Sequence, residues 1–249
     1  MVVLPGRGVV VAAPLADLPV SSGKTCFCSI VIPVYQDDEA LLLLLADLQS
    51  MRAHGYQIIV VNGQQPVTVN DNFLTMTDQY IFASKGRAAQ MNAGAAIADG
   101  QILWFLHADT RLDVDACHHQ ILQISLTEKS WGFFAVRLSG AALIYRLIEK
   151  LMNLRSCLTA IATGDQGIFV KKSAFAKVGA YPSQPLMEDI EISKRLKTLS
   201  KPLCATVRIV TSSRRWQQRG VIKTILLMWW LRLAYWSGAP ASRIAQWYQ

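Results

Sequence analysis

The sequence lacks the features that mark several protein classes. Its five cysteines include no CxxC pair, so we expect neither a disulfide framework nor a zinc knuckle, and a reducing compartment fits best. Only 17% of the 249 residues are charged and 52% are apolar, a balance that excludes intrinsic disorder. No internal repeat and no composition change that would mark a linker interrupts the chain. A single α/β domain with a sizeable core is therefore expected.

Charge is unevenly distributed along the chain. Residues 1–136 carry 7 basic and 12 acidic side chains, whereas residues 137–249 carry 18 basic and 5 acidic ones, within a total of +8. A basic second half points to an anionic partner, which could be a phosphate-bearing ligand, a nucleic acid or an acidic membrane surface.

The order of apolar segments predicts an α/β fold with a mostly parallel central sheet flanked by helices, because short apolar strands alternate with helices. Strands are expected at 29–34, 56–61, 80–83, 102–106, 131–138, 167–170 and 203–210. Helices are expected at 41–48, 88–98, 141–154, 187–196 and 221–236. We predict a loose N-terminal extension (1–28), one α/β domain (29–212) and a basic, apolar helical segment (213–249). The extension fits a signal peptide poorly, which favours a cytoplasmic location.

Several polar residues directly follow predicted strands. In open parallel sheets, ligands bind beyond the carboxyl ends of the strands. This rule selects Tyr35 and Asp37 after the first strand, Asn62 after the second, and His107 and Asp109 after the fourth. Asp109 is placed to hold a divalent cation against a diphosphate, or alternatively to cap the next turn.

The predicted helix 187–196 contains a second candidate carboxylate. Asp189 lies three residues before Ile192 and shares its apolar stripe, whereas Glu188 and Glu191 are expected on the outer face. A carboxylate on the inward face could act as a general base toward an acceptor hydroxyl. The alternative is an acidic first turn that is stabilised by the helix dipole.

Two basic groups could bind phosphate. Gly86 and Arg87 begin an Ala-rich helix, and Arg214, Arg215 and Trp216 follow the last strand. A helix N-terminus and arginine guanidinium groups suit phosphate oxygens, although solvated surface charge is the alternative for each group.

Taken in order, these segments resemble the family 2 glycosyltransferases of GT-A fold, and in particular the subgroup labelled for arsenosugar biosynthesis. The resemblance rests on six motifs: SIVIPVY at 29–35, GRAAQMNAGA at 86–95, FLHADT at 105–110, GDQ at 164–166, MED at 187–189 and RRW at 214–216. Six motifs in the same order are far more specific than any one of them.

The resemblance implies transfer of a sugar from a nucleotide diphosphate donor, UDP- or GDP-linked, to a hydroxyl group of a small-molecule or lipid-linked acceptor. It implies an inverting reaction assisted by Mg or Mn, with Asp109 and His107 at the metal, Asp189 as catalytic base and Glu188 beside it. The donor nucleotide and diphosphate would contact Pro33, Tyr35, Asp37, Asn62, Arg87, Asn92, Arg214, Arg215 and Trp216. The acceptor would contact Asp165 and Gln166, and no nucleic acid is expected.

Two positions depart from the family pattern. Asn62 stands where the wider family has an aspartate, which changes the expected contact with the base because an amide also donates. His107 occupies the first position of the DXD motif and leaves fewer carboxylates for a metal. These departures keep two alternatives open: a nucleotide-sugar-binding protein without turnover, and a nucleotidyltransferase.

The segment 221–236 is almost wholly apolar and includes Lys223 and Arg232. Its sixteen residues fall short of the roughly 20 that a spanning helix needs. A helix lying on the anionic inner face of a membrane is one interpretation, and a core helix or a dimer face are the others.

Overall fold

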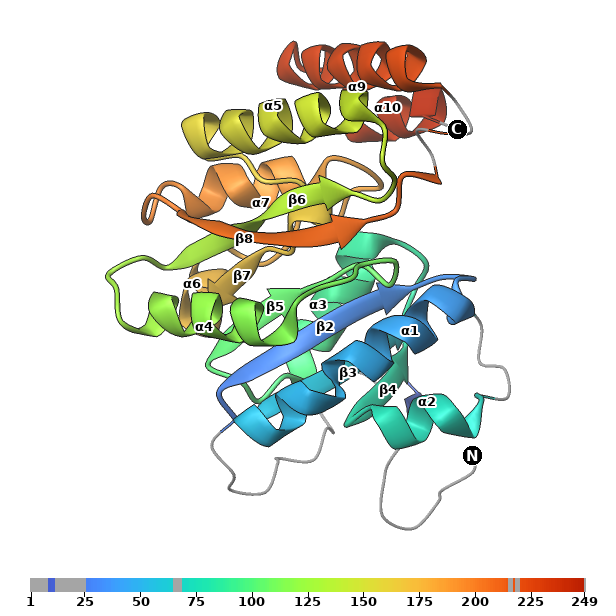
Figure 1. The fold of residues 1–249 in the computed structure, drawn as a ribbon, viewed down its shortest axis with the longest axis vertical. Coiled ribbons are helices and arrows are strands. Elements are labelled where there is room, and N and C mark those ends of the chain that lie inside the picture. Colours follow the sequence, from blue (N-terminus) through green and yellow to red (C-terminus); the bar gives the residue numbers. More distant parts are fainter. Residues whose placement is uncertain (1–8, 12–25, 65–68, 215–216, 218–219, 249) are drawn as a thin grey trace.

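A computed structural model describes residues 9–11, 26–64, 69–214, 217 and 220–248. In this part of the chain, eight strands form one sheet in the order β1-β4-β3-β2-β5-β7-β6-β8, with helices on both faces (Figure 1). The strands are β1 (Val9–Val11), β2 (Cys28–Val34), β3 (Tyr56–Asn62), β4 (Gln79–Phe82), β5 (Ile102–Phe105), β6 (Trp131–Leu138), β7 (Phe169–Lys171) and β8 (Leu203–Thr211). The helices are α1 (Asp38–Leu48), α2 (Asp71–Met76), α3 (Arg87–Ile97), α4 (Val114–Ser125), α5 (Leu143–Thr159), α6 (Lys172–Lys177), α7 (Glu188–Leu196), α9 (Val221–Trp236) and α10 (Ala241–Tyr248), with 3-10 turns η1 (Gln49–His54) and η2 (Gly164–Gln166).

The sheet is mostly parallel, as predicted. The neighbours β1 to β5 all pair in parallel, as do β6 and β8. Among the strands that the structure describes, only β7 runs antiparallel, to β5 on one side and β6 on the other. Each of the seven predicted strands is present. The loose extension predicted for 1–28 is wrong at Val9–Val11, which pairs with β4, because an edge strand presents free backbone donors and acceptors to an added strand.

Alternating side chains of the central strands pack into two hydrophobic cores, one on each face of the sheet. Ile30 and Ile32 of β2 pack in the cluster that contains the buried leucines of α1 and the apolar side of α4. Val31 points to the other face, where the core contains residues of α3, α6 and α7. Figure 1 shows α1 and α4 in front of the sheet and α3 behind it. The period of two along β2 thus assigns each helix layer to one face.

The approach of α3 to the sheet is close because of one glycine. A Cβ built on Gly94 would lie 2.5 Å from Val31 Cγ1 and 3.0 Å from Val61 Cγ2. On the same helix, buried Gln90 donates from Nε2 to the carbonyl oxygens of Val34 and Val61, both at 2.8 Å. These contacts fix the N-terminal end of α3 beside the carboxyl ends of β2 and β3.

The C-terminal helices lie at one end of the molecule. α5 packs on β6, and α9 and α10 lie next to it at the top of Figure 1. The predicted helix 221–236 is present with the same bounds as α9. Within the described residues, every helix is too short or too polar to cross a membrane.

Candidate active site

A cavity of about 430 Å³ opens at the carboxyl end of the parallel strands, where the strand-end rule predicts a site. Its polar lining comprises Asp37, Arg87, His107, Asp109, Thr163, Gly164, Asp165, Asp189, Thr211, Ser212, Arg214, Arg232 and Tyr248. Leu186, Met187, Ile190, Met228 and Leu231 form its apolar wall. Four carboxylates and three guanidinium groups thus share a space large enough for a small-molecule ligand.

Asp189 is held at the cavity by two backbone amides. It lies in the first turn of α7, where its Oδ2 accepts from the Gly164 amide at 3.0 Å and its Oδ1 accepts from the Ile190 amide at 2.8 Å. Met187, which precedes the helix, has a φ of +65°, an uncommon conformation for a residue with a side chain. The carboxylate is therefore fixed in direction while it still lines the cavity.

Glu188 is buried, so the prediction of an outer-face position is wrong. Its side chain is only 4% exposed, and its Oε1 lies 2.9 Å from Nε of Arg87, which lines the cavity. Among the described residues, Oε2 has no hydrogen-bond partner. Burial raises the pKa of Glu188, and the neighbouring Arg87 guanidinium offsets part of this rise. The prediction from helical spacing failed here because the first turn of α7 faces the start of α3 rather than solvent.

The loop that contains η2 contacts the side chain of His107. His107 Nδ1 lies 3.2 Å from Asp165 Oδ1, and both residues line the cavity. A Cβ built on Gly164 would approach His107 Nε2 to 2.7 Å, so only glycine leaves room for the ring in this position. The predicted metal residue His107 and the predicted acceptor residue Asp165 are thus brought together.

Asp109 lies on the same cavity with Asp37 and Asp165 nearby. Burial raises the pKa of Asp109, and these two carboxylates raise it further, while His107 lowers it. The part of the chain that the structure describes has no group of three His, Cys, Asp or Glu side chains arranged to hold a metal. The carboxylate oxygens of Asp37, Asp109 and Asp165 at the cavity are nevertheless of the ligand type that a hard divalent cation prefers.

The cavity also contains residues that the motifs did not identify. Arg232 and Tyr248 reach it from α9 and α10, beside Arg214, which was predicted. The available signal for Arg232 was a cation inside an otherwise apolar helix. Arg215 and Trp216 lie outside the described residues.

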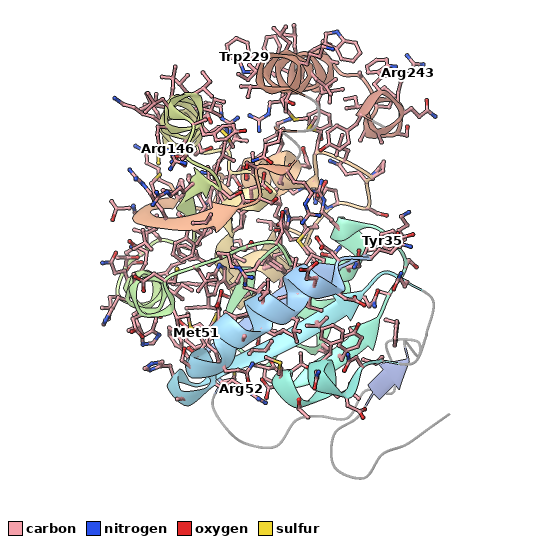
Figure 2. All side chains as sticks on the ribbon, turned by 45° about the vertical axis from the view of Figure 1, so that its right-hand side comes forward. Tyr35, Met51, Arg52, Arg146, Trp229 and Arg243 are labelled. Atoms are coloured by element: carbon pink, nitrogen blue, oxygen red, sulfur yellow. The ribbon has the colours of Figure 1, made fainter. Side chains whose placement is uncertain are left out.

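Three predicted donor residues at the ends of β2 and β3 do not line the cavity. Pro33 is buried within β2, and Tyr35 lies beyond it, 39% exposed, with Lys85 Nζ 4.1 Å from its ring centroid (Figure 2). Asn62 is only 3% exposed and donates to the Tyr80 hydroxyl at 2.9 Å. Its Oδ1 also accepts a backbone amide, so the Asn62 side chain stabilises the strand end.

Asn92 and Gln166 also serve the fold rather than the cavity. The Asn92 amide pairs with the backbone N–H and C=O of Tyr181, at 3.0 and 2.8 Å. Gln166 is fully buried, and its Oε1 accepts from the Ser156 hydroxyl and the Thr163 amide. Buried amide groups need internal partners, and both side chains have them. The contacts of Asn92 with the donor and of Gln166 with the acceptor stay predictions.

Comparison with known proteins shows the family of the chain. The profile of glycosyl transferase family 2 matches residues 29–169, more than half of the chain. The chain belongs to this family.

A curated relative, the probable glycosyltransferase YdaM of Bacillus subtilis (strain 168), is 21% identical over 235 residues, covering 84% of this chain and 54% of its own length.

Solved structures share the fold. The mannosyltransferase PcManGT from Pyrobaculum calidifontis, in complex with GDP-Man and Mn2+, superposes with a TM-score of 0.60 at 13% identity, over 85% of this chain and 62% of its own. S. aureus TarS 1-349, in complex with UDP-GlcNAc, superposes with a TM-score of 0.59 at 12% identity, over 76% of this chain and 59% of its own. The chain spans about half to three fifths of the lengths of these relatives. Its fold is GT-A-like.

Proposed function

We propose that the protein transfers a sugar from a nucleotide diphosphate donor to a hydroxyl acceptor with inversion at the anomeric carbon. The observation that carries this proposal is Asp189, a carboxylate oriented by two backbone amides at a cavity that also contains three arginines and Asp109. Support comes from family membership and from the nucleotide sugars named for two proteins of the same fold.

The reaction that this lining supports is a direct displacement. The Asp189 carboxylate takes the proton of the acceptor hydroxyl, whose oxygen forms a bond to the anomeric carbon while the bond from that carbon to the diphosphate breaks. The electron pair leaves with the nucleoside diphosphate. Arg87, Arg214 and Arg232 can stabilise the negative charge that develops on it.

A divalent cation, Mg or Mn, would be held by Asp109, with His107 as the second candidate ligand. When bound, it supplies charge neutralisation at the diphosphate. Glu188 does not line the main cavity, so we assign it a positioning role through its ion pair with Arg87. Asp165, which does line the cavity, stays a predicted acceptor contact.

The test measures release of nucleoside diphosphate from a panel of UDP- and GDP-sugars, with and without Mg or Mn. Asp189→Asn should lower kcat about 10²- to 10⁴-fold and leave donor binding unchanged, since a general base contributes that much to the rate. The matched control is Glu191→Gln on the same helix, which should retain activity. The Glu191 carboxylate does not line the cavity, and its Oε1 lies 3.2 Å from Nε of Arg195.

Three outcomes would contradict the proposal. Donor binding without any release would indicate a nucleotide-sugar-binding protein. Pyrophosphate release from a nucleoside triphosphate would indicate a nucleotidyltransferase. Full activity of Asp189→Asn would remove Asp189 from the role of base. The arsenosugar subgroup stays a prediction, as does the small-molecule or lipid-linked acceptor, which a panel of acceptor alcohols tests once a donor is known.

A further inference from the structure

Helix α5 leaves a continuous row of leucines uncovered. The five leucines Leu143, Leu147, Leu151, Leu154 and Leu158 recur at helical spacing and are 53 to 86% exposed. The opposite side of α5 is buried, through Tyr145 and Ile148. A row of this kind falls within one side of the helix and is costly to leave in water.

Helix α9 shows the same pattern with aromatic residues. Leu226, Trp229, Trp230, Leu233 and Trp236 are 47 to 80% exposed and lie on one side of the helix. Its inner side packs through Leu231, which is fully buried, in the cluster with α10 and the start of α7.

The two rows belong to one end of the molecule. Val221 and Ile225 of α9 pack in the cluster with Tyr145 and Ile148 of α5, so the helices are neighbours. Figure 1 shows both beyond the sheet at the top, and Figure 2 shows Trp229 on the side of α9 away from the sheet. We call the ten residues of the two rows the apolar face.

Charge indicates what covers the apolar face. Residues 192–249 contain eleven Lys and Arg and no Asp or Glu. Lys150, Lys223 and Arg243 are exposed, and Lys150 and Lys223 lie on α5 and α9, the helices that carry the two rows. If a second copy of the chain covered the apolar face, its cations would lie against the same cations of the first copy, and this repulsion is unfavourable. An anionic lipid surface complements both the cations and the tryptophans, whose amphipathic rings favour the headgroup region.

We propose that the apolar face docks on an anionic membrane surface, with α5 and α9 lying in the interface and neither helix crossing it. The opposite side of α9 contributes Met228, Leu231 and Arg232 to the cavity. Docking would therefore hold the cavity about one helix diameter, roughly 10 Å, from the headgroups.

The test is flotation of the full chain with vesicles of phosphatidylglycerol and phosphatidylethanolamine, compared with vesicles of phosphatidylcholine. The partition coefficient should be at least about tenfold higher on the anionic vesicles and should fall with salt. Two double variants address one helix each: Leu147→Gln with Leu151→Gln, and Trp229→Gln with Trp236→Gln. Each should lower the partition coefficient at least about tenfold, since each removes two buried apolar groups from the bound state.

Leu126→Gln is the matched control, because Leu126 is 84% exposed at the end of α4, away from the apolar face; it should bind vesicles like the parent protein. Equal partition of parent and both double variants would overturn the proposal, as would equal binding to neutral and anionic vesicles. So would a dimer in sedimentation analysis that both double variants abolish without any vesicle binding. Thermal melts report whether each variant folds. Donor cleavage measured without vesicles tests the proposed function separately, so the two failures are distinguishable.

Discussion

Replacing Arg87 by Met isolates the buried carboxylate of Glu188. The Nε to Oε1 distance is 2.9 Å, and Glu188 Oε2 has no hydrogen-bond partner among the described residues, so Arg87 is the charge that compensates this carboxylate. Methionine keeps most of the apolar stem. Removing one partner of a fully buried pair costs about 3–5 kcal/mol, but the Arg87 side chain is 44% exposed, so we expect about 2 kcal/mol. At this chain length that corresponds to roughly 4–8 °C in Tm.

The loss should depend on pH. Burial already raises the pKa of Glu188, and the pKa rises further without the guanidinium. A carboxyl group with a higher pKa in the folded state binds its proton more tightly there, so the free energy of unfolding falls as pH rises through that interval. The deficit of Arg87→Met is therefore small near the ordinary glutamate pKa of about 4.3 and complete once the folded-state group has ionised.

Urea denaturation at acidic and mildly alkaline pH measures this effect. Glu188→Gln, and the double variant with Arg87→Met, complete a double-mutant cycle, and the double variant should recover most of the loss at alkaline pH. An equal deficit for Arg87→Met at both pH values, with no recovery in the double variant, would refute the assignment of the loss to an unpaired Glu188 carboxylate.

Two more predictions concern the carboxyl ends of the strands. Asp109→Asn should stabilise the protein without metal at neutral pH, because burial and the neighbouring Asp165 and Asp37 raise the pKa of Asp109 and its ionised form is unfavourable in the fold. The gain should vanish below the ordinary aspartate pKa of about 3.9, and thermal melts that show a loss at neutral pH would contradict it. Gln90→Leu removes two hydrogen bonds of 2.8 Å and should lower the free energy of unfolding in urea by about 2 kcal/mol, at about 1 kcal/mol for each bond; an unchanged denaturation midpoint would show that the bonds do not hold the strand ends.

Local pattern predicted the strands well because they are short apolar segments, of which β2, β3 and β5 are buried along their whole length. It failed for Val9–Val11, whose position depends on a free edge of β4 that no local pattern reveals. It also gave no indication of how α9 and α10 would lie, since an apolar helix can pack on a core, a partner or a lipid surface.

The candidate site, too, was predicted in part from the sequence. Strand-end position identified Asp37, His107 and Asp109, and all three line the cavity. Helical spacing placed Asp189 correctly at the cavity but put Glu188 on the wrong side of α7. Helical spacing considers one helix alone, whereas Glu188 is buried where α7 meets Arg87 of α3.

The sequence by itself determined the alternation of strands and helices, the carboxylates at the strand ends and the separation of acidic and basic halves, because these depend on residue order and local periodicity. Only the tertiary structure decided which side chains face the cavity and which serve the fold. Asn62, Asn92 and Gln166 turn inward because buried amides satisfy internal partners, and Arg232 and Tyr248 reach the cavity because α9 and α10 pack across it. Such contacts join segments far apart in the chain, where residue spacing carries no information.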